Sequence, residues 1–331
     1  MIGSALVRLA TFNVLHGQRL PDDGRPPRTP SGTVDVHPLI DAVAALDADV
    51  VALQELDRFQ ERSGRVDQAR AIAEATGAAD WRYASAFHAR SGPGRAWAPD
   101  RSEPGLRVYG PKGAGHDGEV PSHGIALLSR LPVLSRRARR FGAPPLAVPL
   151  PVAGRAGLTV IRDHPRVALA AVLQGRRGPF TAVALHLSFV PGWNLRQLLA
   201  VHRWIADLPR PHILLGDFNI PGAIPAATLG AAELLAPSSR ATPSAPRTPS
   251  APRTPSMPPT PSMPSMPQPD GLPPRSGWHH LARVRTFPSH RPLVQLDHVL
   301  AAGLGPHRPQ SVRAPRMPIS DHRPVVVELQ L

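Results

Sequence analysis

Eight segments of the chain carry runs of apolar residues, and polar residues stand at or near one end of several of them. Runs of this length are typical of strands that are buried on both faces of a sheet. They cover residues 5–14, 49–56, 125–130, 167–173, 181–188, 212–218, 296–301 and 323–331. Apolar residues at helical spacing predict helices between them, at residues 37–48, 67–77 and 194–208. The pattern therefore predicts a strand-rich α/β fold in which helices cover sheets.

Two segments interrupt this pattern. Residues 91–122 are rich in glycine and proline, and we expect a long loop there, either a substrate-facing lid or a disordered stretch. Residues 240–275 hold a proline-rich tract in which APRTPS occurs twice in succession, and such a tract cannot pack a core. We expect a disordered insertion, either a docking ligand for a proline-binding domain or a tolerated surface loop. Because candidate site residues lie on both sides of it, residues 1–331 are expected to form a single domain.

The composition excludes several classes of protein. Hydrophobic residues make up 42% of the chain, but every apolar run ends before the ~20 residues that a membrane helix needs. The N-terminus lacks the pattern of a secretory leader, so we expect a cytoplasmic monomer without a transmembrane segment. The chain has no cysteine, which excludes disulfides, thiolate nucleophiles and cysteine-ligated metals. Its chemistry must come from carboxylates, histidines and, if a metal takes part, a hard metal ion.

The formal net charge of +14 is compatible with a nucleic-acid partner. However, Lys112 is the single lysine among 38 basic residues, and the chain also holds 43 prolines. A compositional bias of the genome would produce the same excess of arginine, so the charge alone leaves a nucleic-acid partner open.

Polar residues near the ends of the predicted strands are the first candidates for a site. Glu55 follows an apolar run, where an unpaired carboxylate would cost several kcal/mol unless a cation compensates it. Taken singly, Glu55 could be a salt-bridged strand end, Asn13 a turn cap and His186 a core histidine. Only their combination favours a site.

The C-terminal part of the chain holds two Asp-His pairs. Asp321 and His322 stand directly before the last strand, and Asp297 and His298 lie a short distance upstream. A carboxylate that accepts from a histidine fixes its tautomer and raises its pKa, which prepares the ring for proton transfer or for stabilising a phosphate.

The segment LLGDFNIP places Asp217 and Asn219 at the end of a buried strand. An ordinary Asx turn would explain them, but their i, i+2 spacing can also bring both side chains to one side of an extended segment. We expect Gly216 to let the backbone approach a metal-bound phosphate and Pro221 to end the strand. In a site for Mg²⁺ or Mn²⁺, Asp217 would orient or deprotonate a water that Asn219 also holds.

Seven stretches carry a family resemblance: TFNVLHG, LQELD, HGIALLSRLPV, ALHLS, LLGDFNIP, TFPSHRPLVQLDHVL and SDHRPVVVEL. In this order and approximate spacing the chain resembles the endonuclease/exonuclease/phosphatase superfamily, which includes deoxyribonucleases, abasic-site endonucleases, sphingomyelinases and inositol polyphosphate 5-phosphatases. The match runs from Thr11 to Leu329 apart from the two interrupting segments. It implies a four-layer α/β sandwich, two face-to-face mixed β-sheets flanked by helices, with the site at one edge.

The resemblance also implies a metal set and a catalytic set. The metal set is Glu55 as the principal ligand of Mg²⁺ or Mn²⁺, with Asn13 and Asp321. The catalytic set is His186, Asp217, Asn219, Asp297 and His322. In these roles His186 contacts the phosphate or assists the leaving group, and His322 pairs with Asp297. Whether His322 or Asp217 is the general base stays open.

Departures from the family pattern narrow the expectation. Abasic-site endonucleases carry a tyrosine motif where this chain has His186, which argues against that branch. Ile125 replaces an asparagine that commonly contacts substrate. Thr286, Phe287 and Arg291 are expected beside the site.

The expected function is a metal-dependent phosphoesterase that hydrolyses a phosphate ester by direct attack of water. A phosphodiesterase or nuclease is the first possibility, and a phosphatase or phosphodiesterase for a small molecule or lipid headgroup is the alternative. A third possibility, an inactive scaffold of the same fold, would require the loss of a site residue, and none is missing from the chain.

Overall fold

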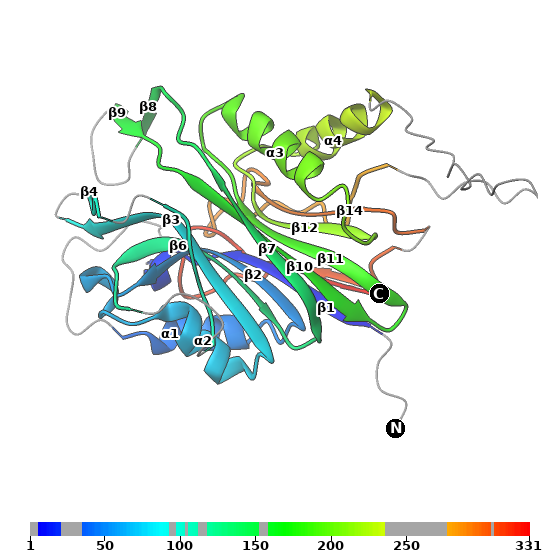
Figure 1. The fold of residues 1–331 in the computed structure, drawn as a ribbon, viewed down its shortest axis with the longest axis horizontal. Helices are drawn as coiled ribbons and strands as arrows, with labels where there is room; N and C mark the ends of the chain where they lie inside the picture. The colour runs from blue at the N-terminus through cyan, green and yellow to red at the C-terminus, as the bar shows by residue number, and fades with distance from the viewer. Residues whose placement is uncertain are drawn as a thin grey trace, which may run out of the picture.

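Two β-sheets pack face to face, and helices cover their outer faces (Figure 1). This computed structural model describes residues 6–20, 35–92, 97–102, 105–111, 118–151, 158–235, 277–305 and 308–331. The predicted four-layer α/β sandwich is confirmed. The predicted proline-rich insertion at 240–275 lies outside the described residues.

The first sheet has eight strands, with a mixed arrangement. Its order is β15 (Ser311–Arg313), β16 (Val325–Leu329), β1 (Val7–Asn13), β2 (Val50–Arg58), β6 (Ser122–Ser129), β3 (Asp80–Ser91) and β4 (Trp97–Pro99), and β5 (Arg107–Tyr109) also pairs with β3. Strands β1 and β2 run parallel, and the other pairs are antiparallel.

The second sheet has six strands. Its order is β13 (His279–His280), β14 (Asp297–Ala302), β12 (His212–Asp217), β11 (Gly178–His186), β10 (Arg166–Gly175) and β7 (Val133–Phe141). Strands β11 and β12 run parallel. Strands β8 (Ala147–Pro151) and β9 (Leu158–Arg162) form a separate hairpin that projects at the upper left of Figure 1.

Each sheet has its own pair of helices. Helices α1 (His37–Ala44) and α2 (Gln68–Thr76) pack on the first sheet, and α3 (Trp193–Trp204) and α4 (Ile224–Leu235) pack on the second. Two short 3₁₀ turns, η1 (Leu15–Gly17) and η2 (Glu61–Ser63), follow β1 and β2. Each pair of helices buries one apolar cluster against its sheet. A third apolar cluster lies between the sheets and consists of inward-facing side chains from both, such as Leu9, Leu169 and Ile213. Burial of these three clusters is the main force that holds the layers together.

Some elements differ from the sequence prediction. The expected long loop at 91–122 contains β4 and β5, which pair with β3. The apolar pattern did not predict β3, β7 or α4, because each carries polar or exposed residues along its length. Among the described residues, no helix is long and apolar enough to cross a membrane.

Candidate active site

The candidate site lies where strands from both sheets end at the same edge. In the parallel pairs, Asn13 is in register with Gln54, and His186 is in register with Asp217. Asp217 also faces Asp297 across the antiparallel pair of β12 and β14. Because parallel strands present the same ends at the same edge, this topology brings residues that are distant in sequence together.

Glu55 occupies an irregular position in β2. The register against β6 shifts between Leu53 and Leu56, and the backbone of Glu55 has a φ of 59°. A bulge of this kind re-aims a side chain, and a left-handed backbone at a non-glycine residue costs about 1–3 kcal/mol. Burial alone would raise the pKa of Glu55, but His123 and a hydrogen bond from Asn13 outweigh it and hold the pKa below its ordinary value. Glu55 is therefore an ionised carboxylate at neutral pH.

Asp217 is the centre of the hydrogen-bonded group. Its Oδ2 accepts from Nδ2 of Asn13 at 3.1 Å and lies 3.6 Å from Nε2 of His186 and 3.8 Å from Nε2 of His322. Burial, opposed by His322 and reinforced by Asp297, raises the pKa of Asp217 to about 7. A carboxyl group with this pKa can exchange protons near neutral pH.

His322 and Asp297 form a buried pair, as the resemblance implied. Nδ1 of His322 lies 2.9 Å from Oδ2 of Asp297. Burial opposes a charge on the ring, but Asp297 and Asp217 outweigh it and hold the pKa of His322 well above its ordinary value. The other imidazole, His186, is held neutral, because burial and then Arg166 push its pKa well below its ordinary value.

Asn13 is fixed by its neighbours in one orientation. Its Oδ1 accepts from the backbone N–H of Leu15 at 3.2 Å, so its Nδ2 faces the carboxylates and donates to Glu55 and Asp217, each at 3.1 Å. Ser320 adds a further tie, because its Oγ donates to the carbonyl of Asn13 at 2.6 Å and accepts from the N–H of His322 at 3.0 Å. The sequence analysis did not single out Ser320; the one available signal was its position directly before the Asp-His pair.

Asn219 completes an Asx turn at the end of β12. Its backbone N–H donates to Oδ1 of Asp217 at 2.9 Å, and its backbone has a φ of 50°. The side-chain Nδ2 donates to the carbonyl of Leu187 at 3.1 Å. The Asx turn is therefore part of the candidate site, because the contacts of Asn219 hold the Asp217 carboxylate in one orientation.

Gly216 is required by the neighbouring strand, because a Cβ there would lie 2.1 Å from the carbonyl oxygen of Leu185, and its role in the approach of a phosphate stays a prediction. One expectation from the sequence is wrong. His298 is no partner of the site, because successive side chains of β14 point to opposite faces. Its Nε2 donates to the carbonyl of Ile220 at 2.8 Å, on the far side of the sheet from the Asp297 carboxylate.

Residues expected beside the site fall into two groups. Oγ1 of Thr286 accepts from the N–H of Asp297 at 3.3 Å, and the ring of Phe287 lies 4.9 Å from that of His322. Arg291 is exposed, and Ile125 is buried in the apolar cluster between the sheets. The first two residues support the His322 and Asp297 pair directly.

Carboxylate oxygens in two parts of the site fit a hard divalent cation. Burial, opposed by His322 and reinforced by the charge of Glu55, raises the pKa of Asp321, and a cation between Glu55 and Asp321 would relieve this repulsion. Ligand atoms of Asp217, Asp297 and His322 lie within 4.8 Å of one another, and Oδ1 of Asp297 is buried without a hydrogen-bond partner among the described residues. The residues present therefore fit a metal ion.

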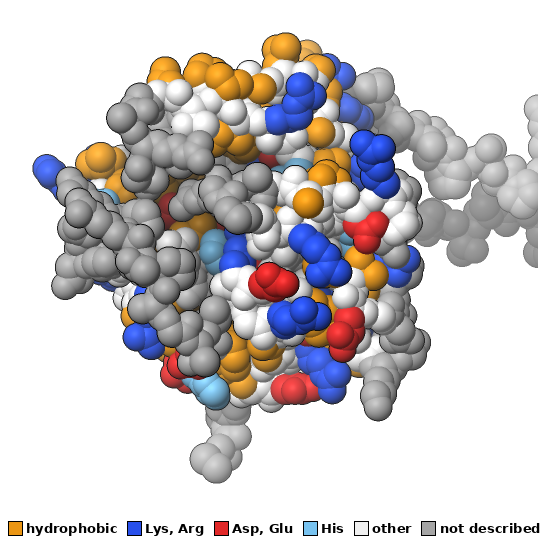
Figure 2. Space-filling model, turned by 90° about the vertical axis from the view of Figure 1, so that its left-hand side faces the viewer, with side chains coloured by type: hydrophobic (Ala, Val, Ile, Leu, Met, Phe, Trp, Pro, Cys, Tyr) orange, Lys and Arg blue, Asp and Glu red, His pale blue; other side chains and the backbone are white. Residues whose placement is uncertain are grey.

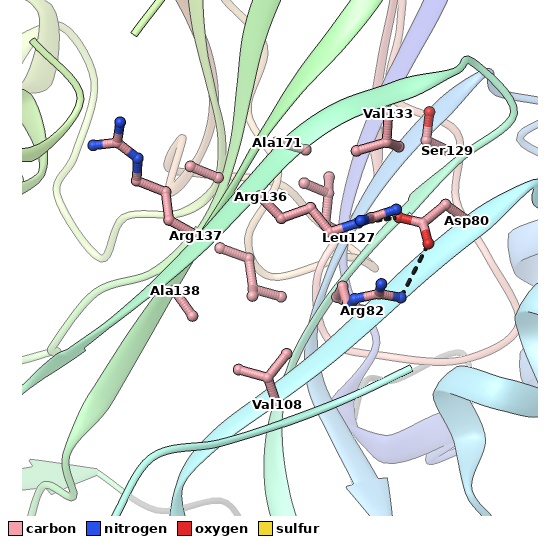
Figure 3. A pocket seen from close by; sticks show the side chains of 12 residues that line it. Asp80, Arg82, Val108, Leu127, Ser129, Val133, Arg136, Arg137, Ala138 and Ala171 are labelled. Carbon is pink, nitrogen blue, oxygen red and sulfur yellow. Dashed lines mark hydrogen bonds and ion pairs between the residues drawn. The ribbon is translucent and has the colours of Figure 1, made fainter. Parts of the chain in front are cut away.

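The structure also has a cavity that lies away from this site. It has a volume of about 210 Å³ and opens between β3 and β6 of one sheet and β7 and β10 of the other (Figure 3). Its arginines are paired, because Arg82 and Arg136 both bind the carboxylate of Asp80, at 3.0 and 2.7 Å. None of its lining residues belongs to the candidate site.

Comparisons with known proteins agree with this architecture. A model of the Endonuclease/Exonuclease/phosphatase family matches residues 10–322. A family protein from Beutenbergia cavernae has a TM-score of 0.52 at 18% identity, over 98% of this chain and 72% of that one. A family protein from Bacteroides vulgatus has a TM-score of 0.53 at 14% identity, over 98% and 99% of the two chains. A mannosyl-6-phosphatase from Bacteroides thetaiotaomicron has a TM-score of 0.52 at 13% identity, over 98% and 100%.

Among curated proteins, no sequence matches this chain. At these identities the solved structures establish the fold alone. The family match covers nearly the whole chain and includes Asn13 and His322, the first and the last residue of the candidate site along the sequence. The chain belongs to the endonuclease/exonuclease/phosphatase family.

Proposed function

We propose that this protein is a metal-dependent phosphoesterase in which an activated water attacks the phosphate ester directly. The observation that carries the proposal is the environment of Asp217, a buried carboxylate that an amide and two imidazoles surround at 3.1–3.8 Å. A pKa of about 7 suits a carboxylate that takes a proton from water near neutral pH.

Glu55 and Asp321 are the proposed ligands of Mg²⁺ or Mn²⁺. When bound there, the ion would neutralise charge that develops on the phosphate oxygens. The Nδ2 of Asn13 holds Glu55 and Asp217 in a fixed relation, since it donates to both carboxylates. In this arrangement Asn13 positions the ligand set, and ligation through its oxygen stays a prediction.

The remaining residues orient the attacking water and carry the protons that the reaction transfers. Asp217 orients the water through the geometry that the Asn219 turn gives it, and His186 faces the same carboxylate from the neighbouring strand. His322 carries a proton that its pair with Asp297 stabilises, so it can bind a phosphate oxygen or protonate the leaving group. Asp217 is the proposed base while His322 is protonated; His322 could take that role only in the fraction of protein in which its ring is neutral, and the pH dependence of kcat separates the two assignments.

Activity is tested on a panel of phosphate esters with Mg²⁺ or Mn²⁺. The panel contains bis(4-nitrophenyl) phosphate, plasmid DNA, RNA, sphingomyelin and inositol phosphates. Asp217→Asn and His322→Gln should each lower kcat by about 10²-fold or more, and the variant whose kcat no longer falls at low pH identifies the base. Asp207→Asn is the matched control, because this exposed aspartate pairs with Arg137 far from the site. Equal inactivity of the wild type and both variants on every substrate would overturn the proposal.

Metal binding is measured independently of turnover. The electron paramagnetic resonance signal of free Mn²⁺ falls as the ion binds, so a titration gives the affinity directly. Glu55→Gln should weaken binding at least tenfold, since one charged oxygen ligand is replaced by a neutral amide. Unchanged Mn²⁺ affinity in this variant would contradict the assignment of Glu55.

A nuclease or other phosphodiesterase is one candidate for the specific activity, because a net charge of +14 favours a polyanionic substrate. A phosphatase or phosphodiesterase for a small molecule or lipid headgroup is the second. Salt dependence separates them, since binding to a polynucleotide weakens steeply with rising ionic strength.

A further inference from the structure

Four ring side chains lie together beside the candidate active site. His164 stacks on Phe87 with ring centroids 4.8 Å apart and an angle of 4° between the planes. Trp97, on β4, meets Phe87 edge-on at 5.4 Å and lies 5.4 Å from the ring of His123. We refer to Phe87, Trp97, His123 and His164 as the ring wall.

A small recess connects the ring wall to the site. Its volume is about 20 Å³, and its lining includes His123, Gly124, His164, Arg166 and His186. A space of this size holds one water-sized group, such as a single hydroxyl. Because His186 lies 3.6 Å from the Asp217 carboxylate, the ring wall borders the place where a phosphate ester would react.

The two arginines that border the ring wall are neutralised by buried carboxylates. Arg62 lies over the Trp97 ring at 4.8 Å and makes two hydrogen bonds of 2.8 Å to Asp57. Arg166 binds Asp163 at 2.8 Å. Of the described residues that contact these rings or line the recess, Arg62 and Arg166 therefore both carry paired charges.

His164 presents a hydrogen-bond acceptor. Nδ1 of His164 faces the carbonyl of Pro165 at 3.1 Å, and a carbonyl can only accept, so Nδ1 carries the hydrogen. Burial, followed by Arg166, lowers the pKa of His164 to about 3, which leaves the ring neutral and its Nε2 a hydrogen-bond acceptor. Nδ1 of His123 lies 2.9 Å from a carboxylate oxygen of Asp57 and 3.3 Å from Nη2 of Arg62. An acceptor nitrogen pairs with a hydroxyl group, whereas the oxygens of a second phosphate would repel it.

We propose that the ring wall binds the non-phosphate part of the substrate, and that this part is a neutral, hydroxyl-bearing ring, as in a sugar monophosphate. The inference rests on the proposed phosphoesterase activity and names the substrate class for the same site. Trp97 and Phe87 supply apolar ring surface for the C–H groups of such a ring. His164 supplies an acceptor for its hydroxyls.

A polynucleotide fits this side of the site less well. Its backbone would need a track of unpaired cations next to the reacting phosphate. Strand β4 lies at the left of Figure 1, on the side that faces the viewer in Figure 2, and basic and acidic side chains of the described residues are interspersed at the lower right of that view. The paired state of Arg62 and Arg166 is consistent with this mixed surface.

The test compares kcat/KM for glucose 6-phosphate, ethyl phosphate and a short oligothymidylate, with Mg²⁺ or Mn²⁺. The proposal predicts the highest value for glucose 6-phosphate. Trp97→Ala and His164→Phe should each lower the ratio of kcat/KM for glucose 6-phosphate to that for ethyl phosphate about tenfold, which corresponds to one lost ring or hydroxyl contact. His164→Phe keeps an aromatic ring against Phe87 and removes the Nε2 acceptor together with the hydrogen bond from Nδ1 to the carbonyl of Pro165. Trp204→Ala, on α3 at the other sheet, should leave the ratio unchanged.

Three results would overturn the proposal: an unchanged ratio in both variants, equal use of ethyl phosphate and glucose 6-phosphate by the wild type, or a preference for the oligonucleotide. Binding of glucose 6-phosphate is measured separately by saturation-transfer NMR. If the protein hydrolyses none of the substrates but binds glucose 6-phosphate in a way that Trp97→Ala abolishes, the proposed activity fails and the ring wall assignment stands. Loss of both would overturn both.

Discussion

Gly216→Ala tests the idea that a close approach of two strands sets the geometry of the site. The added Cβ would lie 2.1 Å from the carbonyl oxygen and 2.8 Å from the carbonyl carbon of Leu185. Carbon–oxygen contacts across neighbouring strands are about 3.3–3.6 Å, so β11 and β12 would have to separate by roughly 1 Å. Overpacking of this kind costs about 1–3 kcal/mol of unfolding free energy.

The same displacement should affect turnover more than stability. His186 and Asp217 directly follow Leu185 and Gly216 and are in register with each other, so the separation falls on two residues of the candidate site. A misplacement of about 1 Å can lower a rate by about 10²-fold. We expect this loss in kcat on whichever phosphate ester the wild type hydrolyses.

Urea denaturation followed by tryptophan fluorescence measures the first effect, and steady-state kinetics measures the second. Gly230→Ala is the matched control, because this glycine lies in α4 with no heavy atom within 4 Å of the added Cβ. It should raise the unfolding free energy by about 0.5–1 kcal/mol, since alanine is the better helix former. Wild-type stability and kcat in Gly216→Ala would refute the reasoning.

Three other substitutions test separate features. Asp297→Asn removes the charge that holds His322 protonated, so kcat should fall about 10²-fold or more; steady-state activity within tenfold of wild type would count against the pair. Ser320→Ala breaks the tie between the carbonyl of Asn13 and the N–H of His322, and urea denaturation should show a loss of about 1–3 kcal/mol; an unchanged midpoint would argue against that tie. Burial lowers the pKa of His298 to about 4 in the folded protein, from about 6.5 in the unfolded chain. The unfolded chain therefore takes up this proton at a higher pH than the folded protein does, and wild-type stability falls as the pH drops below about 6.5. At pH 5 this amounts to about 2 kcal/mol, and His298→Gln should lack that part of the acid slope in pH-dependent urea titrations; an identical slope would contradict it.

The strands that could be predicted from the sequence are those whose burial on both faces produces a run of apolar residues. Strands β10, β11 and β12 are covered on both faces, so their apolar residues run without interruption. Strand β7 is an edge strand that carries four arginines, and β3 alternates aromatic, polar and small residues, so neither shows the pattern. Their place in the sheets is decided by pairing with distant segments.

The residues of the candidate site also separate into those that the sequence could predict and those that it could not. Polar residues that end apolar runs, such as Asn13 and Asp217, could be recognised from the sequence alone. Adjacency in sequence suggested Asp297 and His298 as a pair, but a strand turns neighbouring side chains to opposite faces, and His322 is the true partner. The ring wall had no local signal, because its four rings come from four separate segments.

The candidate site is divided between the two sheets, with Asn13 and His322 on one side and Asp217 and Asp297 on the other. Two hydrogen bonds cross the division, from Asn13 to Asp217 and between His322 and Asp297. The distance between these groups therefore depends on the thickness of the apolar layer that separates the sheets. A change of side-chain volume in that layer, remote from every polar group of the site, would therefore alter turnover while the protein stays folded.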